Sequence, residues 1–291
     1  MKRFYFEKNT LMLFMVCAFL VSCNDKVEED MIETTSPLNK EVDSKTISCG
    51  YVDGYWNSTS YLSNFIINQN QTNWIFSIAN NLCSMWGITY LELGFVKDNV
   101  YPNSTFNAMS YSNNKIYFGE RLYRVALSRG QIVPAFIMAH EIGHQLQYKH
   151  NIPTVQENTA RATELEADGF AGYYMRRPNG YNANWSQAGP GFEFAAELGD
   201  NFIYDANHHG TRAQRRSATR LGWYLGAYNL DVYNFDFNFF YYYQYVLGGQ
   251  FKSARPSSIT TEMHNDIMSK MDELKKINSG EIDKSEFEQL N

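Results

Sequence analysis

The stretch of sequence that decides the fold reads Ala-His-Glu-Ile-Gly-His-Gln-Leu-Gln over residues 139–147. It lies in the most regular segment of the chain, and Pro134 stands where the first turn of a helix tolerates proline, so we expect a helix from residue 135 to about residue 148. At about 100° per residue, His140 and His144 lie about 40° apart on the surface of this helix. Two imidazole nitrogens can therefore reach one metal ion from adjacent turns.

Glu141 lies one position further round the same helix. From there its carboxylate can meet a metal-activated water without taking a coordination position, which is the placement that a general base needs. Ile137, Met138 and Ile142 surround the motif with apolar side chains and predict a mostly buried helix. Burying two imidazoles costs free energy unless their ring nitrogens find hydrogen-bond or metal partners. The pattern therefore favours a metal site.

A third ligand must come from elsewhere, and two residues compete for that role. His150 follows His144 by six positions, as in the metzincin pattern, but Gln147 stands where that pattern has a glycine that turns the chain back. If the helix continues, His150 lies about 120° from His144 and cannot join the site.

The stronger candidate lies on a second predicted helix, which we expect to begin at a capping box of Thr154 and Glu157 and to run to about Met175. Glu164 and Asp168 are four residues apart in it and share a face. One carboxylate can bind a metal ion while the other accepts the outer N–H of a ligating histidine and fixes its tautomer.

The order Glu-x-x-Ala-Asp after His-Glu-x-x-His is the mark of gluzincin metallopeptidases. The wider sequence resembles the bacterial neutral zinc metallopeptidase family over about residues 100–228, with its segments in the expected order. These segments are 107–111, 115–119, 139–147, 164–172, 198–200 and 209–215. The resemblance implies an α+β, predominantly α, zincin-like fold with a small sheet packed on the His-Glu-x-x-His helix.

The same resemblance implies the roles of the site residues. Zinc (Zn²⁺) would be held by His140, His144 and Glu164. Glu141 would be the general base, and Asp168 would support a ligating histidine from outside the metal site.

The segment around His209 leaves two interpretations open. His209 is a candidate catalytic residue, as a proton donor or oxyanion partner near the zinc. The alternative is a structural role at the start of the next helix, which Thr211 can cap. Tyr173 and Tyr174 are further candidates for stabilising an oxyanion.

The amino terminus resembles that of a bacterial lipoprotein. Lys2 and Arg3 precede an apolar run of 11 residues over 11–21, about half the length that spans a bilayer as a helix. The run ends in Leu-Val-Ser-Cys, which resembles a lipobox with Cys23 as the lipidated residue; an ordinary signal peptide is the alternative. We expect a protein anchored by this lipid to a membrane of the cell envelope, at the outer membrane, on its periplasmic or surface face.

Composition and charge narrow the class of protein. The chain of 291 residues is 44% hydrophobic, 16% aromatic and 19% charged, which excludes a disordered or coiled-coil protein. Cleavage after residue 22 removes three basic side chains and one acidic side chain, so the net charge changes from -6 to -8. An acidic chain is a poor ligand for phosphate backbones, and we expect no nucleic-acid partner.

Four segments follow from these patterns. They are a lipoprotein signal peptide (1–22), an acidic tether (23–48), a zincin-like metallopeptidase domain (49–250) and a C-terminal helical appendage (251–291). In the mature chain, Cys49 and Cys83 are predicted to form a disulfide, with two free thiols as the alternative. Residues 235–245 hold eight aromatic side chains, which are interpreted as a buried element of the core or as an exposed platform for a ligand.

The carboxyl end resembles the second half of a calcium-binding EF-hand loop around Gly280, Asp283 and Glu286. That alignment puts Lys275 and Ile277 at the first and third loop positions, which need oxygen ligands. We therefore expect no functional calcium site and a helical segment over residues 261–290.

The sequence thus predicts a zinc metallopeptidase that hydrolyses peptide bonds of a protein or peptide substrate with a zinc-activated water and Glu141 as general base. The alternative is a catalytically inert lipoprotein whose zincin scaffold binds glycan or protein through its aromatic-rich C-terminal part.

Overall fold

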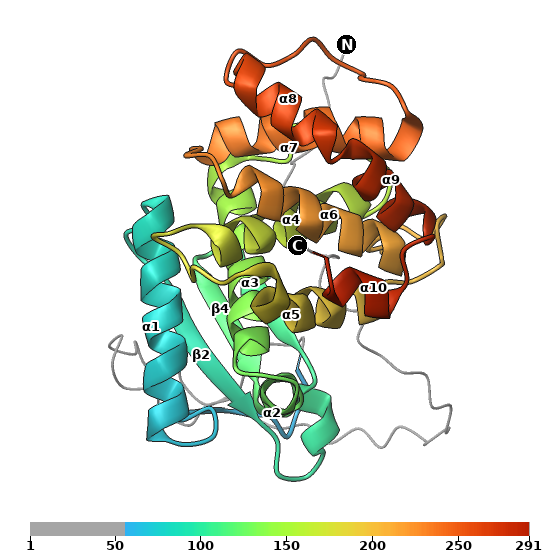
Figure 1. Cartoon of the computed structure of the whole chain (residues 1–291). Coiled ribbons are helices and arrows are strands. Elements are labelled where there is room, and N and C mark those ends of the chain that lie inside the picture. The colour runs from blue at the N-terminus through green and yellow to red at the C-terminus, as the bar shows by residue number, and fades with distance from the viewer. Residues whose placement is uncertain (1–55, 291) are drawn as a thin grey trace, which may run out of the picture.

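Helices make up most of the part of the chain that the computed structural model describes, residues 56–290 (Figure 1). The strands are β1 (Tyr61–Ser63), β2 (Glu92–Lys97), β3 (Ala108–Tyr111) and β4 (Lys115–Gly119). The helices are α1 (Gln69–Trp86), the 3₁₀ helix η2 (Pro102–Thr105), α2 (Glu120–Ser128), α3 (Ile132–His150), α4 (Arg161–Arg176), α5 (Trp185–Glu197), α6 (Arg212–Leu225), α7 (Val232–Gly248), α8 (Thr261–Ser269), α9 (Met271–Ser279) and α10 (Lys284–Glu288). The predicted α+β, predominantly α class is confirmed.

Several predictions concern residues outside the described range, namely the signal peptide, Cys23, the acidic tether and Cys49. Cys83 forms no disulfide with another described residue, and burial raises the pKa of its thiol to about 11. Its pairing with Cys49 stays a prediction. Among the helices of residues 56–290, none combines the length and the apolar character needed to cross a bilayer.

The strands form one mixed sheet in the order β1-β2-β4-β3. The central pair, β2 and β4, is parallel, and each outer strand is antiparallel to its neighbour. Side chains alternate between the faces, so that Phe95 and Phe118 join the main core with α1, while Val96 and Tyr117 join a smaller cluster on the other face. At the end of the sheet, β3 contacts α3, as the prediction of a small sheet on this helix requires.

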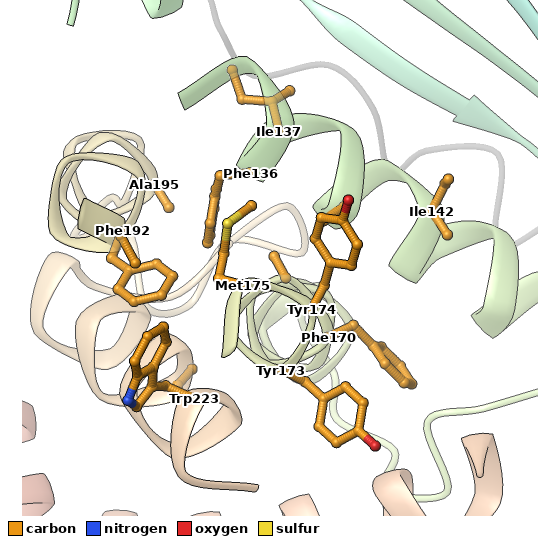
Figure 2. Packing of buried hydrophobic residues seen from close by; sticks show 14 of the residues in the cluster. Phe136, Ile137, Ile142, Phe170, Tyr173, Tyr174, Met175, Phe192, Ala195 and Trp223 are labelled. Carbon is orange, nitrogen blue, oxygen red and sulfur yellow. The ribbon is translucent and has the colours of Figure 1, made fainter. Parts of the chain in front are cut away.

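The helical layer is built around α4, which contacts α3, α5, α6 and α7. Figure 2 shows Met175 and Phe170 projecting from α4 toward different neighbours. On one side, Phe136 of α3, Phe192 of α5 and Trp223 of α6 form a chain of edge-to-face rings with centroids 5.3 Å and 6.1 Å apart. Such rings bury large apolar areas in fixed geometry and hold α4 in place.

The backbones of α4 and α6 touch directly because glycines line their contact. A Cβ on Gly172 would lie 2.2 Å from the carbonyl oxygen of Thr219, and a Cβ on Gly222 would lie 2.0 Å from that of Gly169. On another side of α4, a Cβ on Gly169 would lie 2.6 Å from the ring of Phe239. No larger residue fits at these points, so the two helices keep one relative position.

The predicted start of the second long helix is wrong. Residues 154 and 157 precede α4, which begins at Arg161. Thr154 does not cap the helix, because its main-chain N–H and its hydroxyl donate to the two carboxylate oxygens of Asp236 at 3.0 and 2.7 Å. Glu157 instead accepts two hydrogen bonds from Arg161. A partner on α7, distant in sequence, thus replaces the local capping box.

Residues 235–245 lie within α7, and most of their rings are buried. Phe235, Phe239 and Tyr243 stack along one face, with centroids 5.8 and 5.4 Å apart, and Phe235 also stacks on Phe170 of α4 at 4.1 Å. Phe237 is 45% exposed. The interpretation as a buried element of the core is therefore confirmed for most of this segment.

The carboxyl end is helical, and its EF-hand-like residues act as helix caps. Lys275 and Ile277 lie inside α9. Gly280 ends α9 in the left-handed conformation, at a φ of 82°. Asp283 and Glu286 form the capping box of α10. Their spacing is thus explained by the geometry of two short helices.

The loop before β3 is organised by one buried carboxylate, that of Asp98. It accepts hydrogen bonds from the hydroxyls of Thr59 (2.6 Å), Ser60 (3.3 Å) and Ser104 (2.9 Å) and from the main-chain N–H groups of Val100 (2.9 Å) and Tyr101 (2.7 Å). Burial opposes ionisation, but these bonds outweigh it and lower the pKa of Asp98 to about 2.

We expect Asp98→Asn to lower the free energy of unfolding at pH 7 by about 1–3 kcal/mol, because an amide has a single acceptor oxygen for the five groups that donate to this carboxylate. The ionised form stabilises the fold fully above the unfolded pKa of about 4, and this contribution is lost as the pH falls toward about 2. Urea unfolding at several pH values should therefore show that the difference in free energy of unfolding between wild type and variant becomes smaller over that interval. A difference that stays constant with pH would contradict the stabilising role of the ionised Asp98 carboxylate. Asp272→Asn, at an 81% exposed side chain, serves as control.

Candidate metal centre and catalytic site

Three of the predicted site residues meet at the contact between α3 and α4. His140 and His144 come from α3 and Glu164 from α4, and one ligand atom of each lies within 4.8 Å of the others. The two Nε2 atoms are 3.1 Å apart. The Glu164 carboxylate lies 3.5 Å from Nε2 of His140 and 3.4 Å from Nε2 of His144.

Hydrogen bonds on the far side of each ring decide where the histidine protons sit. Nδ1 of His140 lies 2.9 Å from Oδ1 of Asp168, and Nδ1 of His144 lies 2.7 Å from Oε1 of Gln147. Both oxygens act as acceptors, so each Nδ1 donates, and Nε2 is the nitrogen that can offer a lone pair to a metal ion once it carries no proton. Two lone pairs and one carboxylate then converge, which is the donor set of a catalytic zinc site and fits Zn²⁺.

The electrostatics of the group favour a positive charge at this point. Burial alone would lower the pKa of His140, but hydrogen bonds to Asp168 and Glu164 raise it to about 10. Burial alone would raise the pKa of Glu164, yet the nearby His209, His140 and His144 hold it below its usual range. The carboxylates of Glu164 and Asp168 thus favour a positive charge between these side chains, and a metal ion bound there would have to displace a proton from His140.

Arg215 on α6 holds the carboxylate that supports His140. It donates from Nε and Nη2 to the two oxygens of Asp168 at 2.7 and 2.8 Å, and Nη2 lies 3.9 Å from Glu164. Burial opposes ionisation of Asp168, but the charge of Arg215 outweighs it and lowers the pKa of this carboxyl. The chain Arg215–Asp168–His140 thus keeps one ring in a fixed orientation.

Glu141 lines the pocket in which these groups lie, and its side chain is buried. The pocket encloses about 810 Å³ of space, its open mouth included. One wall comes from β3 and the residue before it, through Asn107, Ala108 and Ser110. The hydroxyl of Ser110 donates to the main-chain carbonyl of Glu141 at 2.6 Å, which ties the edge strand to the helix of the motif. The apolar part of the lining is formed by Leu122, Phe136, Ile137, Phe194, Ala195 and Leu198.

His209 lines the same pocket, and Asp200 supports it. Its main-chain N–H donates to Oδ2 of Asp200 at 3.0 Å, and its ring Nδ1 lies 3.7 Å from that oxygen. The start of α6 is capped separately by a box of Thr211 and Gln214. The helix start therefore has its own cap, and the ring of His209 borders the pocket.

Three further residues that the sequence suggested for the site, His150, Tyr173 and Tyr174, do not line the pocket. His150 ends α3, which continues as a helix, and its ring contacts Tyr233 with centroids 5.3 Å apart. Tyr173 and Tyr174 are buried in the core and do not line the pocket, so the proposed oxyanion role for them is wrong. The hydroxyl of Tyr173 instead donates to the carbonyl of Tyr228 at 2.9 Å.

The sequence motifs gave no role to four residues of the site. Arg215 and Tyr148 line the pocket, and the Tyr148 hydroxyl donates to the carbonyl of Ser110 at 3.2 Å. Gln147 contacts His144, and Glu166 contacts Gln147. Burial and the nearby Asp236 carboxyl raise the pKa of Glu166 well above its usual range. Gln147, Glu166 and Arg215 lie within segments that carry the family resemblance, 139–147, 164–172 and 209–215, and Tyr148 follows the first of them, but no motif assigned these residues a role.

Comparisons of the chain with models of protein families, with curated proteins and with solved structures find no match.

Proposed function

We propose that this protein is a zinc-dependent metallopeptidase with a zincin-type active site, which hydrolyses peptide bonds with Glu141 as general base. One observation carries the proposal: the two histidine lone pairs and the Glu164 carboxylate converge in a pocket that Glu141 also lines. His140, His144 and Glu164 are the residues that would hold the zinc. When bound there, the ion would supply a Lewis acid that polarises a carbonyl and lowers the pKa of water.

The protein groups account for the proton transfers. Glu141 lies on the motif helix beside the ligands, where it can accept the proton of the attacking water and pass it to the leaving amine nitrogen. The imidazole of His209 borders the same pocket and can donate a hydrogen bond to the oxygen on which negative charge develops.

The walls of the pocket indicate how a peptide would bind. β3 pairs only with β4 among the described strands, so an extended peptide could add to its outer edge. The Ser110 carbonyl on this strand already accepts from the Tyr148 hydroxyl, so the peptide would have to share or displace that hydrogen bond. The apolar part of the lining, which includes Phe136, Phe194 and Leu198, suits an apolar side chain of the substrate. The proposed substrate is therefore an extended protein segment or peptide.

We also propose that the enzyme is a lipoprotein of the cell envelope. The support is the lipobox-like sequence that ends at Cys23, preceded by a basic start and a short apolar run. Its membrane contact would then be the lipid on Cys23.

Metal content and a cleavage profile on a proteome-derived peptide library test the proposed function together. We expect about one zinc per chain, with cleavage that a chelator abolishes and added zinc restores. His144→Ala should bind zinc much more weakly, because it removes one of three ligands. His150→Ala, on the same helix but with its ring against Tyr233, should keep both zinc and activity. A wild-type protein that binds no zinc and cleaves no peptide would contradict the proposal.

A further inference from the structure

A buried chain of polar side chains leads from His144 away from the pocket. It passes through Gln147 of α3 to Glu166 of α4, and Asp236 of α7 lies next to Glu166. Gln147 is 1% exposed, and the two acidic residues are fully buried. None of these three residues lines the pocket, so their arrangement does not serve substrate contact.

The partners of the Gln147 carboxamide fix which of its two ends faces His144. Its Nε2 donates to the carbonyl oxygen of Thr163 at 2.8 Å and to Oε2 of Glu166 at 2.9 Å. A main-chain carbonyl can only accept, so the atom that faces it must be the NH₂ group. A flipped amide would set two oxygens against each other in a buried place, which is costly. The other end, Oε1, therefore points at Nδ1 of His144.

An amide oxygen at this point selects one tautomer of His144. The ring must carry its proton on Nδ1, 2.7 Å from the oxygen, and must leave the lone pair of Nε2 free. Nδ1 of His140 is held by a carboxylate instead, that of Asp168, which is itself paired with Arg215. One ligating histidine is thus oriented by a charged pair and the other by a neutral amide.

We propose that Gln147 is a positioning residue that fixes the tautomer and ring orientation of His144, and that Glu166 and the Thr163 carbonyl hold Gln147 in that orientation. This inference rests on the proposed zinc site. It predicts that removal of the amide weakens zinc binding even though Gln147 touches neither the metal position nor the pocket. Outer partners of metal-ligating histidines typically account for about 10- to 100-fold in metal affinity.

The test compares Gln147→Met with Gln145→Met. Both residues are buried amides on α3, and Gln145 donates to the carbonyls of Tyr111 and Lys115 instead of contacting a histidine. Zinc dissociation constants are measured by chelator competition on folded protein. We expect Gln147→Met to bind zinc about 10- to 100-fold more weakly and Gln145→Met to stay within about threefold of wild type.

Nitrogen-15 NMR of His144 gives a second readout that a purely structural role would not change. In wild type we expect the proton on Nδ1, and in Gln147→Met a mixture of tautomers in the zinc-free protein. Glu166→Gln keeps an oxygen acceptor for Gln147 and should preserve zinc affinity, whereas Glu166→Leu should weaken it. Unchanged affinity and an unchanged tautomer in Gln147→Met would overturn this inference and leave the proposed function standing. A wild type that binds no zinc would overturn both.

Discussion

Glu141→Gln is expected to lower kcat for peptide hydrolysis by about 10²- to 10⁴-fold, the usual contribution of a general base, while zinc content stays near one per chain. Glutamine has nearly the same shape as glutamate but cannot accept a proton from water at neutral pH. Glu141 borders the pocket and is not among the three groups that converge on the metal position. The ligand set is therefore left intact. Single-turnover cleavage of a library-derived peptide, together with metal analysis, measures both quantities.

A matched control is Glu262→Gln, at an exposed position on α8. It carries the same change in charge and should cleave at the wild-type rate. Full peptide cleavage by a zinc-loaded Glu141→Gln protein would refute Glu141 as the base. Loss of zinc from this variant would instead show that Glu141 supports the metal.

Gly222→Ala is expected to lower the free energy of unfolding by about 3 kcal/mol, the upper part of the range for overpacking. In an open helix, this substitution gains up to about 1 kcal/mol from helix propensity. Here the new Cβ would lie 2.0 Å from the carbonyl oxygen of Gly169, and that oxygen belongs to the backbone of α4. The helices must separate, so strain outweighs propensity.

Gly248→Ala supplies the opposite case in the same protein. Gly248 also lies in a helix, and a Cβ there meets no atom within 4 Å. We expect it to be neutral or to stabilise the fold by up to about 1 kcal/mol. Denaturant unfolding of the two variants measures the difference directly. Equal effects at both positions would mean that the contact between α4 and α6 adjusts without cost.

Local sequence patterns predicted the parts of the fold that depend on local rules. The helix of the motif was expected over about residues 135–148, and α3 spans Ile132–His150. The predicted cap at Thr211 is present. The start of α4 was placed too early, because a local capping signal competed with Asp236, which is 82 residues further along the chain. The local spacing of residues along the sequence cannot predict a hydrogen-bond partner that lies so far away in the chain.

In the candidate site, too, some residues could be predicted from local spacing, whereas the roles of others depend on tertiary contacts. Helical spacing placed His140 and His144 on one face of their helix, and Glu164 with Asp168 on one face of the next, before any tertiary structure is known. The choice of Glu164 as the third ligand came from the family resemblance, and the structure brings its carboxylate to the two histidines. Arg215 and Gln147 have roles that depend on which helices pack together and on the orientation of an amide. Their chemistry is visible only when the contact between α3, α4 and α6 is known.

The ligand groups lie on two helices, with His144 and Glu164 separated by 20 positions in the chain. An ion held by both would act as a reversible crosslink that the unfolded chain cannot form in the same geometry. By linkage, the free energy of unfolding would then rise by about 1.4 kcal/mol for every tenfold increase in free zinc above its dissociation constant. If the proposed site binds zinc, the concentration of free zinc would thus set the fraction of chains that are folded, as well as the fraction that carry the proposed activity.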